Sequence, residues 1–287
     1  MKVIDIHIHG GGGYDTQTVD PGDLLRIAEI QASRGVSAII PTIYPAKINK
    51  MRTHIEAVKK AMEIQAREES HGSKILGVNL EGPFLNPSFP GALDPQVFLP
   101  PAERHYREIT EGFENIIKVV TISPELKGAL ALTRLLSDRG VAVSLGHTNA
   151  TFSEAERAYQ QGAHCITHLF NAMRPYHHRE PGIAGFGLLN PHIYVELIGD
   201  QFHLHPRTLD LVFRVKNPSK IIIVSDSVKE TPDHESPTTA NLENGTGKLM
   251  GGAIDVVTAA TKLIKAGFNR ELILPCISFN PERYLSS

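Results

Sequence analysis

The feature of this sequence that most restricts its fold is an alternation of short apolar runs with helical patterns, repeated eight times along 287 residues. The runs are rich in β-branched residues and nearly continuously apolar, as are strands buried on both faces of a parallel sheet. We expect these strands at residues 3–8, 36–42, 74–80, 116–122, 141–145, 164–169, 193–198 and 220–224. Eight such alternations favour an α/β fold of the closed (β/α)8, TIM-type barrel kind, with an open doubly wound sheet as the alternative.

Helix boundary signals lie between the predicted strands. Asp20-Pro21 and Ser123-Pro124 each combine an N-cap residue type with proline at the first helical position, and Pro206 would open a helix in the same way. Gly35 and Gly140 stand where C-terminal caps belong, directly before the next strand. No linker composition interrupts this rhythm, so we expect residues 1–287 to form a single barrel domain. The polar segment 227–247 predicts a long loop after the eighth strand, a mobile flap over the site.

Composition and charge exclude several classes of partner. The net charge of −2 gives no electrostatic signal for nucleic acid or an anionic membrane surface. No apolar run approaches the roughly 20 residues that span a bilayer, and the first residues lack the pattern of a signal peptide. Cys165 and Cys276 have no metal or redox spacing, which indicates a reducing compartment, the cytoplasm.

Metal-binding residue types recur at the carboxyl ends of the predicted strands. They are His7 and His9 after the first strand, Glu81 after the third, His147 after the fifth, His168 after the sixth, Asp200 and His203 after the seventh, and Asp226 after the eighth. In a barrel these ends converge on the face where active sites are built. Imidazole and carboxylate donors suit Zn²⁺ or Fe²⁺. Such an ion lowers the pKa of a water and polarises a carbonyl, and a nearby carboxylate can act as base and then as acid.

Each of these residues also has a structural explanation when taken alone. The alternation in DIHIH fits a strand that buries isoleucines on one face and presents polar groups on the other. Glu81 and Asp226 could each cap a turn. The agreement between successive strands, with the polar residues at the same end each time, favours a shared site over these separate explanations.

The marked residues lie in segments that resemble the N-acetylglucosamine-6-phosphate deacetylases of the amidohydrolase superfamily. The segments are IDIHIHGGGG (4–13), NLEGPFLNP (79–87), SLGHTNATFSEA (144–155), THLFNAMRPYHHREPGIAG (167–185), IGDQFH (198–203), VSDS (224–227) and the weaker NPERYL (280–285). They span nearly the whole chain. The segment with THLFNAM and REPG is highly specific, whereas the HxH pair marks only the superfamily.

The resemblance implies a role for each matching residue. Glu81, His147 and His168 would be the main metal ligands, the His7 and His9 pair would support a second ion, and Asp226 would be the catalytic acid and base. The positions that match substrate contacts are Asn171, Ala172, Arg179, His203, Met250, Gly251, Ala92 and Leu93. The implied reaction hydrolyses the N-acetyl amide of an amino-sugar phosphate, with one or two zinc or iron ions, in a homodimer whose phosphate contacts lie near the subunit interface.

This sequence departs from the family pattern in three places. Family members usually carry a small β-sandwich made from both chain ends, and we expect most or all of it to be absent here. The family loop Gly-Ala-His reads Gly91-Ala92-Leu93, and the usual Thr-Asp-Ala reads Ser225-Asp226-Ser227. The alternatives are an amidohydrolase for a cyclic amide or a different N-acyl compound, and a non-catalytic metal-binding barrel. For Arg179 the alternative role is a surface ion pair with Glu180 or another loop carboxylate.

Overall fold

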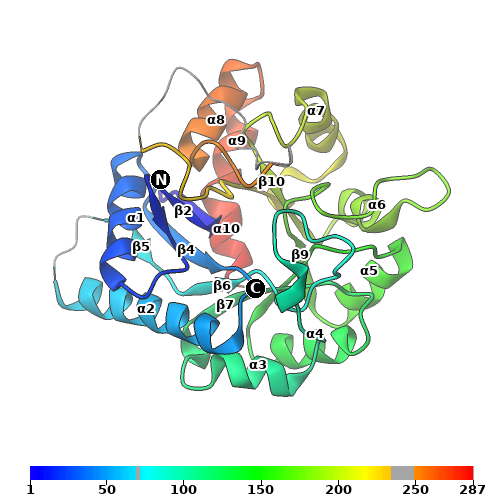
Figure 1. The fold of residues 1–287 in the computed structure, drawn as a ribbon. Coiled ribbons are helices and arrows are strands. Elements are labelled where there is room, and N and C mark those ends of the chain that lie inside the picture. The colour runs from blue at the N-terminus through cyan, green and yellow to red at the C-terminus, as the bar shows by residue number, and fades with distance from the viewer. Residues whose placement is uncertain (69–71, 234–248, 287) are drawn as a thin grey trace.

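A computed structural model describes residues 1–68, 72–233 and 249–286, which form a sheet surrounded by helices (Figure 1). Eight parallel strands follow one another around the sheet in chain order. They are β1 (Ile4–Ile8), β4 (Ala38–Ile43), β6 (Val78–Leu80), β7 (Ile117–Ile122), β8 (Ala142–Leu145), β9 (Ala163–Ile166), β10 (Tyr194–Ile198) and β11 (Ile221–Val224). Each predicted strand therefore has a counterpart in the barrel, with bounds that differ by a few residues, and only the one at 74–80 is interrupted.

The sheet closes where its first and last strands meet. The backbone N–H of Asp226 donates to the carbonyl of His7 over 2.9 Å, and the N–H of His9 donates to the carbonyl of Ser227 over 2.7 Å. The Oδ1 atom of Asp5 accepts from the N–H of Ser225 at 3.3 Å, in place of a regular ladder bond. These bonds join β1 to the end of β11, so the (β/α)8 barrel is the correct one of the two predicted architectures.

A helix follows each barrel strand. The eight helices are α1 (Pro21–Ser33), α2 (Ile48–Arg67), α3 (Glu103–Thr110), α4 (Ala129–Asp138), α5 (Phe152–Gln160), α6 (Gly182–Leu189), α7 (Pro206–Val215) and α8 (Val256–Lys265). Short 3-10 turns lie at η1 (Pro95–Val97), η2 (Glu114–Ile116) and η3 (Pro218–Lys220). None of the helices in the described ranges has an apolar stretch long enough to cross a bilayer.

Most of the predicted helix boundaries are confirmed. The Asp20 side chain accepts from the N–H of Gly22 at the start of α1, and α7 begins at Pro206. Gly35 and Gly140 follow α1 and α4 with φ of +87° and +73°.

Two boundary predictions are wrong. The Ser123-Pro124 pair does not open a helix, because α4 begins at Ala129 and the Ser123 hydroxyl instead donates to the carbonyl of His147 at 2.7 Å. The predicted strand 74–80 is interrupted between β5 (Lys74–Ile75) and β6. Gly77 lies in the gap with φ of +148°, where an added Cβ would meet the carbonyl oxygen of Ile116 at 2.4 Å. The backbone turns there because only glycine fits.

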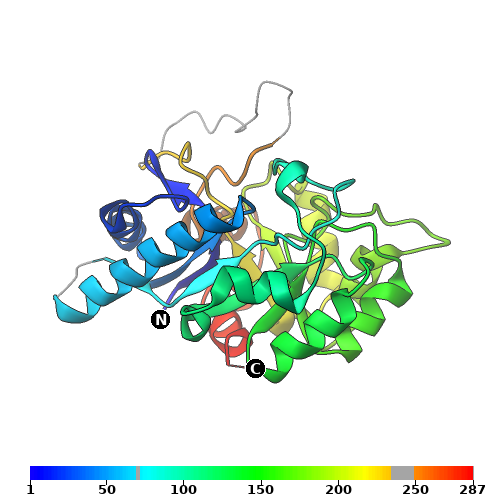
Figure 2. The ribbon, with the colours of Figure 1, turned by 60° about the horizontal axis from the view of Figure 1, so that its bottom comes forward.

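The barrel interior is filled with apolar side chains below its polar end. Ile6, Ile40, Val119 and Ile222 belong to an inner cluster that also includes Tyr284. Tyr284 lies on α10 (Phe279–Tyr284), which follows α9 (Arg270–Cys276) and covers the end of the barrel where the strands begin (Figure 2). A larger cluster fills the space between the sheet and its helices. The polar residues predicted to form the site therefore lie at the opposite end of the barrel, where the strands finish.

The remaining described strands lie outside the barrel path. The hairpin of β2 (Gly10–Gly11) and β3 (Tyr14–Asp15) follows β1, and β5 pairs with β4. No β-sandwich occurs among the residues that the structure describes. The expected flap is described only as far as residue 233, and its residues 234–247 lie outside the described part of the chain.

Candidate metal centre and substrate pocket

A cavity of about 580 Å³ opens at the carboxyl ends of the barrel strands. Residues from loops far apart in the sequence line it together, as the convergence of strand ends predicts. Of the residues singled out from the sequence, those that line it are His9, Glu81, Ala92, Leu93, His147, His168, Asn171, Ala172, His203, Asp226, Met250 and Gly251. His7 lies buried beside His9, and Arg179 lies elsewhere.

Glu81, His147 and His168 form one compact group at the floor of the cavity. Glu81 Oε1 lies 3.0 Å from Nε2 of each histidine, and the two Nε2 atoms lie 3.1 Å apart. All three side chains are almost fully buried. Donors held about 2.0–2.1 Å from a tetrahedral zinc ion would lie roughly 3.3 Å from one another, so this spacing fits a metal ion.

The hydrogen bonds of His147 orient its ring as a metal ligand at this place would need. Its Nδ1 atom lies 3.0 Å from the carbonyl oxygen of Phe89, which can only accept, so Nδ1 carries the hydrogen. In a neutral ring Nε2 is then an acceptor, yet it faces the Glu81 carboxylate and Nε2 of His168. Three acceptors so close together repel one another unless a proton or a metal ion lies between them.

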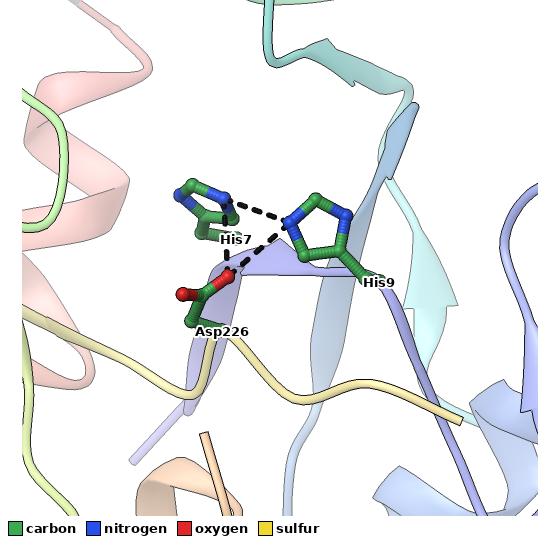
Figure 3. Close-up of side chains that lie close together, drawn as sticks. All are labelled: His7, His9 and Asp226. Atoms are coloured by element: carbon green, nitrogen blue, oxygen red, sulfur yellow. Dashed lines mark hydrogen bonds and ion pairs between the residues drawn. The ribbon is translucent and has the colours of Figure 1, made fainter. Parts of the chain in front are cut away.

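His7, His9 and Asp226 form a second group on the closing seam of the barrel. Figure 3 shows their side chains pointing toward one another. His7 Nε2 lies 3.2 Å from His9 Nε2, and the two atoms lie 3.4 and 3.2 Å from Asp226 Oδ1. These distances also match the donor spacing of a metal site.

The carboxylate of Glu81 lies between the two groups. Its Oε1 atom is 3.4 Å from His7 Nε2, and its Oε2 atom is 3.3 Å from His9 Nε2. Each group therefore has access to an oxygen of the same residue. The donor set of imidazoles and carboxylates suits zinc or iron, and the geometry fits two neighbouring ions that share Glu81.

The electrostatics of the two groups favour positive charge. Burial alone would lower the pKa of His7, but the Asp226 and Glu81 carboxylates raise it well above its usual value. For His9, burial again lowers the pKa, and hydrogen bonds to Asp226 and Glu81 raise it to about 9. Burial would raise the pKa of Glu81 and of Asp226, but His7 and its neighbours hold both carboxyls below their usual values. The carboxylates that attract protons here attract a metal ion equally well.

Unusual backbone conformations aim three of these side chains at the cavity. His147, His168 and Asp226 have φ of 48°, 30° and 48°, in the left-handed region that residues with a Cβ rarely adopt. Each lies just past the end of a strand. Such conformations cost about 1–3 kcal/mol each and are concentrated at functional sites.

A bulge in β1 places the histidine pair. From Asp5 to Ile8 the strand advances three residues while β4 advances only two, from Ile39 to Pro41. Side chains replace the missing ladder bonds: Ile8 N–H donates to Thr42 Oγ1, and Asn79 Nδ2 donates to the Ile6 carbonyl. Bulges re-aim side chains next to active sites, and here the bulge precedes His9 directly.

His203 lines another part of the cavity and is paired with Asp200. Asp200 does not approach either ligand group, because its side chain caps the turn after β10 and lies 2.8 Å from His203 Nδ1. Burial would lower the pKa of His203, but the bond to Asp200 raises it above its usual value. Asp200 Oδ2 also accepts from the Ala253 N–H at 3.4 Å, which ties this turn to the loop of Met250 and Gly251.

Arg179 does not line the cavity of its own chain. It is exposed on a turn between His177 and Glu180, in a loop that extends away from the barrel (Figure 2). Among the described residues Arg179 makes no ion pair with Glu180, whose Oε1 atom accepts from the backbone N–H groups of Phe152 and Gly182. The side chain is therefore presented to the surroundings of the molecule.

Several residues in and around the cavity were not predicted from the sequence. Tyr44 and Asp15 line the cavity beside His9, with the Tyr44 hydroxyl donating to Asp15 Oδ2 at 3.1 Å. Lys229 and Glu230 line it from the loop after β11. Glu196 lies in the apolar strand YVELI and touches His7 from below. A carboxylate in such a strand must be paired when it is buried, which is a signal for a partner inside the barrel.

Comparison with known proteins identifies relatives over most of the chain, although no family model matches it. It is 35% identical to N-acetylglucosamine-6-phosphate deacetylase of Bacillus subtilis over 79% of this chain and 57% of that protein. It is 32% identical to the Bos taurus enzyme of the same name, over 98% of this chain and 73% of that protein. An N-acetylgalactosamine-6-phosphate deacetylase of Escherichia coli is 29% identical, over 98% of this chain and 76% of that protein. The chain thus spans well under two thirds of the Bacillus subtilis relative.

Solved structures of similar proteins have the same fold. N-acetylglucosamine-6-phosphate deacetylase from Thermotoga maritima superposes with a TM-score of 0.87 at 30% identity, over 99% of this chain and 78% of that one. A mutant of the Mycobacterium smegmatis enzyme, in complex with N-acetyl-D-glucosamine-6-phosphate, gives a TM-score of 0.89 at 25% identity, over 99% of this chain and 77% of that one.

Proposed function

The chain belongs to the N-acetylglucosamine-6-phosphate deacetylase family, and from this premise we propose that it hydrolyses the N-acetyl amide of N-acetylglucosamine-6-phosphate. The products would be acetate and glucosamine-6-phosphate. The observation that carries the proposal is the pair of ligand groups joined by Glu81 at the mouth of the barrel. A proton acceptor, metal donors and a cavity for a sugar phosphate all meet there.

The roles of the residues follow from their positions. Glu81, His147 and His168 would hold one metal ion, and His7, His9 and Asp226 would hold a second, shared through Glu81. A bound divalent ion would polarise the acetyl carbonyl and lower the pKa of the attacking water. Asp226 lines the cavity and has the lowered pKa of a carboxylate that is ionised at neutral pH.

Asp226 would therefore do the proton chemistry. It would take the proton from the attacking water as the new C–O bond forms, and deliver that proton to the amide nitrogen as the C–N bond breaks. The leaving sugar amine then departs neutral, and the acetyl group leaves as acetic acid, which gives its remaining proton to solvent and becomes acetate. Asn171, Ala172, Met250 and Gly251 would orient the sugar along the wall of the cavity.

We propose that the phosphate of the substrate is bound by His203 and Arg179. His203 lines the cavity with its ring oriented by Asp200, so an imidazolium N–H is available to an anion. Arg179 is exposed on its projecting loop, and we propose that it reaches the site of a second subunit in a homodimer. The planar guanidinium can donate two parallel bonds to a phosphate.

Three further features are part of this proposal. The ions would be zinc or iron, because the donors are imidazoles and carboxylates. Residues 1–287 would act as one barrel domain. The protein would work in the cytoplasm, in line with Cys165 and Cys276, which are both free and buried. The substrate is a small molecule, and the proposal involves no nucleic acid and no membrane.

The test is acetate release by zinc-loaded and iron-loaded protein. The protein should release acetate from N-acetylglucosamine-6-phosphate and at most slowly from the unphosphorylated sugar. The galactosamine epimer belongs in the same assay, because Leu93 replaces a polar residue of the family loop in the cavity wall and a relative carries that specificity. Hydrolysis of another N-acyl compound or of a cyclic amide alone, followed by its own product, would replace the proposed substrate. Metal-loaded protein that hydrolyses none of these would be a metal-binding barrel without this activity.

A further inference from the structure

Glu196 is a charged side chain in the middle of an otherwise apolar strand. It lies in β10, inside the barrel, with no exposure to solvent. Its Oε1 atom has no hydrogen-bond partner among the described residues. Burying a carboxylate is costly unless a positive charge or several donors compensate it, so its surroundings should contain a cation.

The side-chain partner of Glu196 is the ring of His7. His7 Nδ1 lies 3.0 Å from Glu196 Oε2, and a carboxylate oxygen of this kind accepts the hydrogen. The Nδ1 atom therefore carries a hydrogen, and in the neutral ring that binds a metal ion the lone pair is on Nε2. Figure 3 shows the second ring nitrogen of His7 pointing away from His9 and Asp226, while Nε2 faces both of them.

The same oxygen also touches the other ligand group, though more weakly. The backbone N–H of His168 donates to Glu196 Oε2 over 3.3 Å. This bond fixes the backbone at the start of the turn that carries His168, and it does not involve the His168 ring. Glu196 thus holds the ring of one proposed ligand and only the backbone of another.

We infer that Glu196 is a positioning residue for a metal ion held by His7, His9 and Asp226. It fixes the tautomer and the plane of the His7 ring, so that Nε2 points its lone pair at the ion. Its negative charge, shared with His7 through the hydrogen bond, makes that nitrogen a stronger donor. The inference rests on the metal centre of the proposed function, not on the identity of the substrate.

The experiment measures zinc binding by metal-free protein, with no substrate present. Glu196→Gln keeps the size of the side chain and an oxygen that can accept from His7, so it removes only the charge. Glu196→Ala removes the charge and the hydrogen bond. We expect the weaker of two zinc equivalents to lose about tenfold in affinity in the first variant and about a hundredfold in the second. The tighter equivalent should change less than threefold.

A matched control separates this effect from a loss of stability. Asp255 is a buried carboxylate that caps α8 and binds Arg34, away from both ligand groups. Asp255→Asn should lower thermal stability but leave both zinc affinities within threefold of wild type. If both equivalents weaken equally in Glu196→Gln, or neither weakens, Glu196 is a structural bridge between strands and the inference is wrong.

A second measurement needs no variant of Glu196. In zinc-loaded wild-type protein with ¹⁵N-labelled histidines, the His7 signal, assigned by its loss in His7→Gln, should show a protonated Nδ1 and a metal-bound Nε2. The reverse assignment would overturn the inference even if the Glu196 variants did not fold. Acetate release is scored separately: wild-type protein that binds two ions but releases no acetate would contradict the proposed function and leave this inference intact.

Discussion

The two ligand groups differ in the kind of backbone that carries them. Glu81 directly follows β6, and His147 and His168 lie just beyond β8 and β9. Each of these three strands has hydrogen-bonded neighbours on both sides. His7, His9 and Asp226 lie where the barrel closes, on a bulged first strand and just after the last one. Strand pairing on both sides supports the strands before the first group, although the β6–β7 and β8–β9 pairings also shift register. The seam that carries the second group is held by a few backbone and side-chain bonds.

This difference predicts which ion is more easily lost. Thr42 and Asn79 satisfy the backbone of the bulge, and Asp5 replaces a ladder bond at the seam. Each of these bonds is made by a single side chain. One substitution can therefore remove a bond and displace the second group without unfolding the barrel. We expect the ion of the seam group to be the weaker of the two.

The largest effect should come from Glu81→Gln, since Glu81 contacts both groups and an amide is a far poorer ligand than a carboxylate. We expect both ions, and essentially all acetate release, to be lost. The double variant of His7→Gln and His9→Gln should lose only the seam ion. Metal analysis of the purified proteins checks this. Equal stoichiometry in the two proteins would mean that the groups do not differ as described, and full metal in Glu81→Gln would exclude this centre.

Asp226→Asn should have the next largest effect. The variant keeps the shape of the side chain but removes the proton acceptor, and loss of a positioned general base typically costs about 10²–10⁴ in rate. We expect turnover to fall by about that factor while the Glu81 group keeps its ion. Steady-state acetate release on zinc-loaded protein measures it. A rate within a few-fold of wild type would remove Asp226 from the proton transfers.

Arg179→Ala tests a residue that belongs to neither group. A charge-assisted bond to phosphate contributes roughly 1.5–3 kcal/mol, which corresponds to about a ten- to hundredfold change. We expect kcat/KM to fall by that factor for the phosphorylated sugar and to stay unchanged for the unphosphorylated one. Equal losses for both sugars would indicate a structural role for Arg179.

A mixing experiment shows whether Arg179 acts on its own chain or on a partner. Arg179→Ala and Asp226→Asn proteins, each weakly active, are unfolded together, refolded and assayed on the phosphorylated sugar. If Arg179 serves the neighbouring site, mixed dimers combine an intact Asp226 with an intact Arg179 and recover activity. Activity no higher than the average of the two proteins would assign Arg179 to its own chain.

The smallest effect concerns His203. Because the bond to Asp200 raises the pKa of His203, the pair stabilises the fold most below about pH 6.5, and this contribution is lost as pH rises through the folded pKa. His203→Gln should therefore lower the free energy of unfolding by about 1–2 kcal/mol at pH 6 and by less at pH 9. Urea unfolding with a chelator present measures both values. A larger loss at pH 9 would contradict the charged pair.

Much of the barrel could be predicted from the sequence because its strands are buried on both faces and read as apolar runs. That the polar residues of the two groups meet could be predicted for a related reason: in a barrel, a polar residue that ends such a run faces the shared mouth. Glu81 and His168 were found in this way although the sequence separates them widely. Neither inference needed the side-chain contacts, only the direction of the strands.

The sequence could not predict features that depend on contacts across the barrel. Ser123 resembles a helix cap, but its hydroxyl is used by the His147 loop. Arg179 lies in a highly specific segment, yet the segment does not encode the direction in which its loop extends. Asp200 follows a strand like the proposed ligands, and only the structure shows that its carboxylate turns to His203. These outcomes depend on which partner lies nearest in space.

The closure of the barrel has a consequence for how the protein is made. His7 and His9 are synthesised more than two hundred residues before Asp226, whose backbone N–H donates to the carbonyl of His7. All other barrel pairings join strands that follow one another along the barrel, so the seam is the most distant pairing and the last that synthesis makes possible. Metal supplied to a nascent chain would find the Glu81 group first. Occupancy of the seam group would then report that the barrel has closed.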